Sequence, residues 1–213
     1  AGTAGNGAPD RQASVRDAFY QYEAATARPA DLWLMLGDTA YNSGTDVEHQ
    51  RAVFDMYPAI LRNRFLWPAL GNHETSQSTT ATDFPYLHIF SLPRNAEGGG
   101  VASGTEKYYS FDYGNIHFIC LDSMTSGQTG TTPMADWLRS DLAAVTAEWI
   151  IVYFHHPPYT KGSHDSDREG DLAAIRANIV PILESNSVDL VLSGHSHCYE
   201  RSYLLHGHYG LST

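Results

Sequence analysis

Long hydrophobic runs are absent from this chain of 213 residues. The longest aliphatic and aromatic runs, residues 32–36 and 149–154, fall far short of the ~20 apolar residues that a transmembrane helix needs. No charged and then apolar leader stands at Ala1, although a mature or trimmed chain would have lost one. The sequence therefore predicts no membrane-spanning helix, and we expect no membrane partner.

Basic residues are also few, with 13 Lys and Arg against 24 Asp and Glu and a net charge of −11. A surface that binds nucleic acid needs a basic stripe, so we expect no nucleic-acid partner. The negative charge offers no long-range attraction for anionic substrates either. Any affinity for phosphate must therefore come from local cations.

Cysteine is scarce, since Cys120 and Cys198 are the only two. Cys120 lies in an apolar run, which favours a buried small side chain over a disulfide partner. Two cysteines do not define the redox compartment. A Gly-x-Ser-x-Gly nucleophile motif is absent, and we interpret Cys198 as a packing residue beside the candidate ligands at its end of the chain.

The composition that remains is that of one globular domain, which we place at residues 1–213. Apolar residues make up 42% and aromatic residues 12% of the chain, enough for a sizeable core. Helical patterns alternate with short apolar strands, which predicts an α/β sandwich with mixed, largely parallel sheets flanked by helices.

The individual elements follow from hydrophobic periodicity and turn residues. We expect helices around residues 15–22, 47–61 (broken near Pro58), 137–145 and 171–184. We expect loops at residues 75–82 and 95–104, where Ser, Thr and Gly are concentrated, and a hairpin turn at residues 113–115. The strands are expected at 32–36, 65–70, 107–112, 116–121, 149–154 and 188–192.

Metal-capable side chains follow several of these strands directly. Asp38, Asn72, His155 and His195 each stand at the end of a short apolar run. Sites in open α/β sheets form beyond the carboxyl ends of the strands, so we expect these side chains to converge. Mixed oxygen and nitrogen ligands are what a pair of hard or borderline cations requires, and the pattern predicts a dinuclear metal centre.

Each candidate oxygen ligand has two interpretations, a metal-binding role and a structural role. The carboxylate of Asp38 can bridge two cations, or it can cap a helix. Tyr41, three residues on, offers a phenolate that suits ferric iron, although most tyrosines serve in packing. Asn72 offers a neutral amide oxygen that leaves a metal a good Lewis acid, or it is a turn residue after Gly71.

The histidines are sorted by strand geometry. His155 and His156 would face opposite sides of a strand, and we assign His155 as the ligand and His156 as packed or solvated. His195 and His197 share a face if the chain is extended there, which allows ligation of neighbouring cations. His73 is placed for a substrate oxygen, with Glu74 orienting it through a hydrogen bond.

Taken together, the ordered motifs resemble the purple acid phosphatases of the calcineurin-like metallophosphoesterase superfamily. Tyr41 favours the purple branch, because related diesterases usually lack that phenolate. The hairpin at residues 108–115 also matches, and the resemblance spans residues 37–201. The motifs that carry it are Gly37-Asp38-x-x-Tyr41, Gly71-Asn72-His73-Glu74, Val152-x-x-His155 and Gly194-His195-x-His197-x-Tyr199-Glu200-Arg201.

The resemblance implies a role for each residue. Asp38, Tyr41 and His197 would hold a ferric ion. Asn72, His155, His195 and the shared Asp38 would hold a divalent zinc, manganese or iron. His73 matches a histidine that contacts substrate, and His164, nine residues after His155, lies close to where the plant enzymes carry a histidine that assists the leaving group. A solvated loop histidine is the alternative for His164.

The resemblance also bears on the chain ends. The family has an earlier strand that ends in Gly-Asp-x-Gly, whose Asp binds the ferric ion, whereas this sequence begins at Ala1-Gly2 and stops at Thr213. We therefore expect residues to be missing at both ends, among them the terminal strands. Without that Asp, the first metal site would lose one carboxylate.

The reaction that the resemblance implies is hydrolysis of a small phosphomonoester by a metal-bound hydroxide that attacks phosphorus in line. A phosphodiesterase or nucleotidase with the same metals is one alternative. A non-catalytic metal-binding remnant is another, because the first Asp is absent. Secretion or a periplasmic location is expected from the relatives, and the sequence leaves the oligomeric state open.

Overall fold

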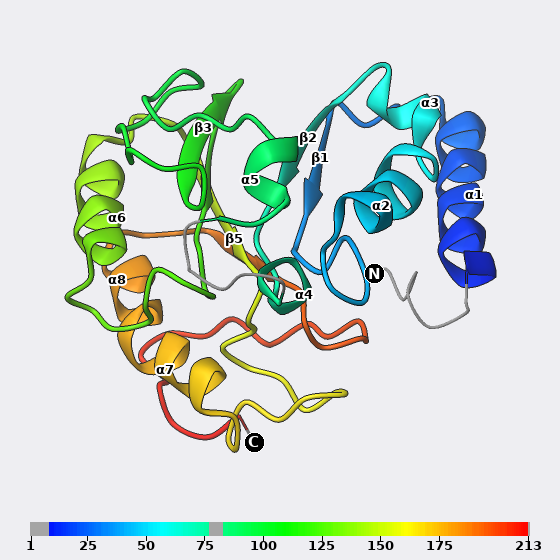
Figure 1. Ribbon diagram of the computed structural model, residues 1–213. Helices are drawn as coiled ribbons and strands as arrows, with labels where there is room; N and C mark the ends of the chain where they lie inside the picture. The colour runs from blue at the N-terminus through cyan, green and yellow to red at the C-terminus, as the bar shows by residue number, and fades with distance from the viewer. Residues whose placement is uncertain (1–8, 77–82, 213) are drawn as a thin grey trace. The chain divides into compact units, whose positions relative to one another are not determined.

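A computed structural model describes residues 9–76 and 83–212 of the chain. The chain divides into two compact units, Ala1–Phe90 and Ser91–Thr213, and each is described by itself. Both combine helices with parallel strands (Figure 1), so the predicted mixed α/β class is confirmed. Among the described residues, no helix has the length and apolarity that crossing a membrane would demand.

The first unit contains a parallel pair of strands. β1 (Leu32–Met35) pairs with β2 (Phe65–Pro68), with Leu32 opposite Phe65 and Met35 opposite Pro68. All four residues of β1 are half-buried, so the strand is confirmed although its expected burial on both faces is not. The helical segments of this unit are α1 (Pro9–Thr26), α2 (Asp46–His49), the π-helix η1 (Gln50–Phe54), α3 (Pro58–Leu61), α4 (Asn72–Thr75) and α5 (Tyr86–Ile89).

Local sequence explains where these helices begin. Pro58 is the first residue of α3. Proline is tolerated there because a backbone N–H in the first turn of a helix has no intrahelical acceptor, so its absence costs nothing. The predicted break lies at this residue. Helix α1 is confirmed, but Val15 and Tyr22 of its apolar pattern are 69% and 61% exposed. The loop expected at 75–82 begins later, because Thr75 still belongs to α4, and residues 77–82 lie outside the described part.

The second unit is built on a four-stranded mixed sheet in the order β3-β4-β5-β6. The first pair is antiparallel and the other two are parallel. A two-residue turn at Gly114 and Asn115 joins the first pair, and Gly114 has φ +61°, which a side chain would disfavour. The strands are β3 (Tyr109–Tyr113), β4 (Ile116–Cys120), β5 (Trp149–Phe154) and β6 (Leu190–Ser193).

Three helices pack against this sheet, α6 (Pro133–Ala144), α7 (Gly170–Asn178) and α8 (Val180–Ser185) (Figure 1). The single helix expected at 171–184 is in fact α7 and α8, because Pro181 cannot donate a backbone hydrogen bond to a continuous helix. Residues 95–104 form a loop, as expected. The core that joins sheet and helices includes Ile119, Val152, Phe154, Leu138, Ile175 and Leu183.

A buried ion cluster ties β4 to its neighbours. The His117 side chain is 3% exposed, with Nδ1 2.6 Å from an Asp112 oxygen and Nε2 2.9 Å from an Asp141 oxygen. Carboxylates only accept, so both ring nitrogens must donate, which requires imidazolium. Burial lowers the pKa of His117, but the hydrogen bonds to Asp141 and Asp112 outweigh it and the net pKa is raised.

We expect this cluster to stabilise the fold at acidic pH. A raised pKa in the folded state gives stability that is complete below the unfolded value of ~6.5 and is lost as pH rises through the folded pKa. His117→Gln should lower the free energy of unfolding by ~2 kcal/mol at pH 5 and by clearly less at pH 9, measured by denaturant titration.

His88→Gln is the matched control, because His88 and Asp83 form an ion pair whose side chains are 70% and 73% exposed. It should change stability little at either pH. An equal loss in His117→Gln at pH 5 and pH 9 would contradict the imidazolium interpretation.

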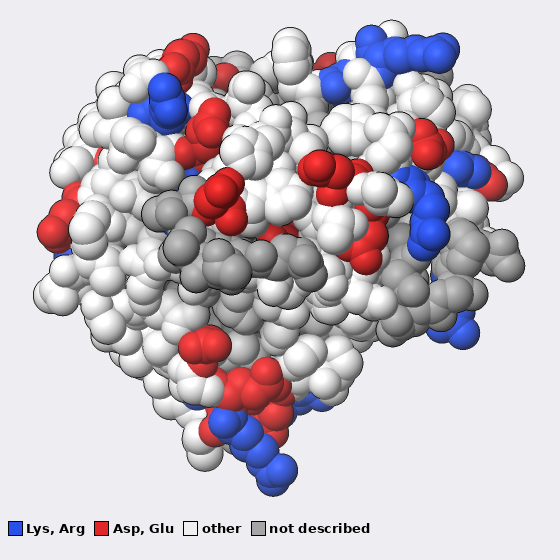
Figure 2. Space-filling view, in the orientation of Figure 1, with Lys and Arg blue, Asp and Glu red and all other residues white. Residues whose placement is uncertain are grey.

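Basic side chains lie in small separate groups on the face shown in Figure 2, rather than in one stripe. The described residues therefore form no concentrated cationic surface on that face, and the formal charge of the chain is −11. The absence of a nucleic-acid partner stays a prediction.

Candidate metal centre

In the first unit, the loop after β1 turns sharply at Asp38. Gly37 and Asp38 have φ of +80° and +52°, in the left-handed region that costs a non-glycine residue ~1–2 kcal/mol. The buried Asp38 carboxylate accepts hydrogen bonds from the His73 backbone N–H at 3.0 Å and from the Tyr41 hydroxyl at 3.2 Å. Asp38 and Tyr41 are therefore in contact, at the position where the sequence predicts a metal.

Tyr41 is 6% exposed, and its ring centroid lies 4.1 Å from that of His73. Burial, and after it the charge of Asp38, raises the pKa of Tyr41. A bound cation would act in the opposite sense and favour the phenolate. The His73 ring directs Nδ1 at the Asn42 carbonyl, so Nδ1 must carry a proton and Nε2 faces away from that bond.

The second loop of this unit follows β2 and starts α4. Gly71 is the N-cap and Asn72 the first residue of the helix. A Cβ on Gly71 would lie 2.3 Å from the Asp38 backbone nitrogen and 2.3 Å from one Asp38 carboxylate oxygen. Only glycine permits the two loops to approach this closely, and the approach brings Asn72 and His73 to the loop that carries Asp38.

Glu74 does not orient His73 as expected. Its side chain is fully buried, and it accepts hydrogen bonds from the backbone of residues 38–40 and of Gly71 and from the Thr39 hydroxyl. The sequence predicted a role for this carboxylate but assigned it to His73, its neighbour in the sequence. The observed partners come mainly from the loop after β1, which local spacing does not indicate.

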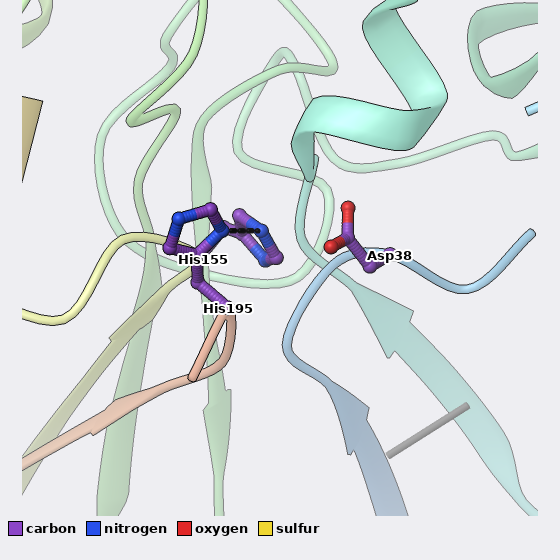
Figure 3. A group of neighbouring side chains, drawn as sticks. All are labelled: Asp38, His155 and His195. Carbon is purple, nitrogen blue, oxygen red and sulfur yellow. Dashed lines mark hydrogen bonds between the residues drawn. The ribbon is translucent and has the colours of Figure 1, made fainter. Parts of the chain in front are cut away.

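In the second unit, His155 and His156 follow β5 and are both buried. The His155 Nε2 lies 3.1 Å from the His195 Nδ1, the dashed contact in Figure 3, where Asp38 is drawn after β1 of the first unit. His156 points its Nδ1 at the Ser123 carbonyl at 3.1 Å. The structure thus packs His156 against a neighbouring loop and directs His155 to another candidate ligand.

His195 follows β6 and has φ +62°, so the expectation of an extended His195-x-His197 pair on one face is wrong. The backbone bends because Ser196 N–H donates to the Gly194 carbonyl at 2.7 Å. His197 is exposed, and its backbone N–H donates to the Ser163 hydroxyl at 2.8 Å. Cys198 is exposed as well, so the expectation that it fills space beside the ligands is also wrong, whereas Cys120 is buried as predicted.

His164 lies against His195, with ring centroids 3.7 Å apart. Its Nδ1 is 2.9 Å from a Glu169 carboxylate oxygen, and Glu169 also accepts from the Asp165 backbone N–H at 2.8 Å. That backbone bond is the largest cause that lowers the pKa of Glu169. His164, Glu169 and His195 have ligand atoms close enough to hold a cation.

Two glutamates in this unit were missed as contributors. Glu169 had no motif to mark it, although it follows His164 by five residues. Glu200 was visible in the Tyr199-Glu200-Arg201 motif but had no assigned role. Glu200 accepts from the Lys161 backbone N–H at 2.9 Å and from the Thr160 hydroxyl, and it thereby joins the loop that carries His164 to the loop that carries His195.

Comparison with known proteins places these motifs in a family context. The model of the calcineurin-like phosphoesterases matches residues 8–199. Purple acid phosphatase 22 of Arabidopsis thaliana is 37% identical over 181 residues, which cover 80% of this chain and 39% of that protein. Purple acid phosphatase 1 of Ipomoea batatas is 30% identical over 194 residues, which cover 85% of this chain and 38% of that protein.

A solved structure shares the fold. Purple acid phosphatase PPD1 from yellow lupin (Lupinus luteus) seeds superposes with a TM-score of 0.64 at 18% identity, covering 82% of this chain and 32% of that one. The chain therefore spans less than two fifths of the length of these relatives.

Proposed function

This chain belongs to the calcineurin-like phosphoesterase family, and we propose on that basis that it serves metal-dependent hydrolysis of phosphomonoesters. One observation carries the proposal. In each unit, the residues that match the family motifs follow the carboxyl ends of parallel strands and contact one another, Asp38 with Tyr41 and His73, and His155 with His195.

We propose the ligand set that the resemblance implies. Asp38, Tyr41 and His197 would hold ferric iron, and Asn72, His155, His195 and the shared Asp38 would hold zinc, manganese or iron. The donor chemistry fits, because a phenol beside a carboxylate suits a hard ferric ion and paired imidazoles suit a divalent one. Contacts within the units support Asp38, Tyr41, His155 and His195, whereas Asn72 and His197 rest on the resemblance.

When bound, two such cations would supply Lewis acidity, lowering the pKa of water and offsetting the charge of the phosphoryl oxygens. The protein side chains would orient and protonate the substrate. His73 holds its Nδ1 proton on the Asn42 carbonyl and would present Nε2 to a phosphoryl oxygen. His164, with Nδ1 on Glu169, would pass a proton from Nε2 to the leaving alcohol.

The test uses the full-length gene product loaded with iron and zinc. We expect about two metals per chain and faster turnover of an aryl monophosphate than of a bis-aryl diester. Preference for the diester would favour a phosphodiesterase or nucleotidase. Less than one metal together with no turnover would favour a non-catalytic remnant.

Tyr41→Phe tests the ferric site separately. A ferric–phenolate pair absorbs visible light, so the wild-type protein should be coloured and the variant bleached. The fold should survive, because the change removes only the hydroxyl that donates to Asp38. Absorption spectra and thermal unfolding measure both effects, and an unchanged visible spectrum would remove Tyr41 from the ligand set.

Location and partners remain part of the proposal. We propose a secreted or periplasmic protein that acts on a small phosphorylated substrate, without nucleic-acid or membrane partners. The purple acid phosphatase names of the relatives and the low content of basic residues support it. Fractionation of cells that express the full-length gene would test the location.

A further inference from the structure

Glu74 holds a turn of the chain that begins at Asp38. Its carboxylate is fully buried and accepts five hydrogen bonds. One oxygen takes the backbone N–H groups of Asp38 at 2.8 Å and Gly71 at 2.7 Å. The other takes the N–H and hydroxyl of Thr39 at 2.7 and 3.0 Å and the N–H of Ala40 at 3.2 Å.

These five donors explain how the buried carboxylate of Glu74 is tolerated. A buried charge is costly unless hydrogen bonds replace its hydration. A carboxylate has about four lone-pair sites, and five donors fill them. Successive backbone N–H groups in a turn form a concave anion-binding nest, and in this molecule the anion in the nest is the side chain of Glu74.

The nest depends on the unusual backbone of Asp38. Its φ of +52° is rarely adopted by side-chain-bearing residues, and such a conformation persists only where the surroundings determine it. The backbone N–H groups of Asp38, Thr39 and Ala40 all donate to the Glu74 carboxylate, and these bonds fix the conformation of the turn. The direction in which the Asp38 carboxylate leaves the backbone is set by this turn.

Glu74 also joins the two loops of the first unit. Its residue lies in α4, while three of its partners follow β1. A Cβ on Gly44 would lie 2.5 Å from the Glu74 Cα, so the backbone at Gly44 also packs closely against Glu74. The loop with Asp38 and the loop with Asn72 and His73 are therefore kept in one frame.

We propose that Glu74 is a positioning residue, whose carboxylate binds the 38–40 backbone and thereby places the Asp38 carboxylate for its ligand role. The metal part of this inference rests on the proposed function, whereas the backbone part does not. Glu74 itself would touch neither metal nor substrate.

The test compares Glu74→Gln with Glu48→Gln in the full-length protein. Glutamine keeps the shape but presents an NH₂ group to backbone donors, so one half of the nest is lost. Glu48 is the matched control, because it also binds a stretch of backbone, the N–H groups of Asn42, Ser43 and Thr45, which lies outside residues 38–40.

Two readouts separate the outcomes. Amide hydrogen exchange on the metal-free protein should accelerate at residues 38–40 in Glu74→Gln and not in Glu48→Gln. Equal exchange rates at residues 38–40 in wild type and Glu74→Gln would overturn the proposal whether or not metal binds.

In the metal-loaded protein, Glu74→Gln should weaken metal affinity by about 10–100-fold, measured by chelator competition. Wild-type metal affinity in that variant would overturn the proposal. A wild-type protein without metal affinity would overturn the proposed function instead.

Thr39→Val covers the case in which Glu74→Gln does not fold. It removes only the hydroxyl donor at 3.0 Å, so its thermal unfolding should change little. Faster exchange at residues 38–40 than in wild type would support the proposal, and exchange identical to wild type would overturn it.

Discussion

His155→Ala is expected to lower turnover about a thousandfold, because losing a proposed metal ligand would remove several kcal/mol of transition-state stabilisation. His155 is fully buried, and its Nε2 lies 3.1 Å from the His195 Nδ1. Its loss should also reduce bound divalent metal to below one per chain. Steady-state kinetics and metal analysis of the same preparation measure both effects.

His156→Ala is the matched control. His156 is the next residue, it is 4% exposed, and its ring nitrogen faces the Ser123 carbonyl at 3.1 Å. This variant should lower the unfolding temperature through lost packing, while turnover below that temperature stays within about tenfold of wild type, although the His156 ring centroid lies 4.7 Å from that of His195. Equal losses of metal in the two variants would show that the ligand was assigned to the wrong histidine.

Asp38→Asn is expected to lower turnover about as much as His155→Ala does, and to weaken the binding of both metals. Its carboxylate oxygens accept from the His73 N–H and the Tyr41 hydroxyl, so an amide of the same shape keeps at most one of these bonds and loses the negative charge. A carboxylate that bridges two cations compensates charge at each of them, and its loss should lower turnover about a thousandfold and weaken the visible band.

Asp55→Asn provides the control in the same unit. Asp55 is exposed and accepts from the Gln50 side chain at 2.7 Å, so its replacement should leave metal content and turnover unchanged. Full metal occupancy and wild-type turnover in Asp38→Asn would remove Asp38 from the centre and with it the bridging role.

Much of the fold could be predicted because its signals are local. The strand at residues 149–154 coincides with β5, since a short apolar run rich in β-branched and aromatic residues specifies a strand. The helix around Trp137 is likewise confirmed. Where the prediction failed, a single residue competed with the period: Pro181 divides the helix expected at 171–184.

The contacts of the candidate site were harder to predict because they join distant residues. Glu74 binds residues that lie 34 to 36 positions earlier, and no periodic pattern encodes such a pairing. The pair His195 and His197 failed for a related reason: a spacing of two implies one face only in an extended chain, and His195 has φ +62°.

The amino-acid sequence alone determined which side chains stand at the carboxyl ends of the strands, because strand length and strand-ending residues are local properties. Only the tertiary structure decided what each of those side chains touches: Tyr41 and His73 at Asp38, His195 at His155, and Glu169 at His164. The reason is physical, since a buried donor or acceptor takes whichever partner the folded backbone brings within about 3 Å, and that partner can come from any part of the chain.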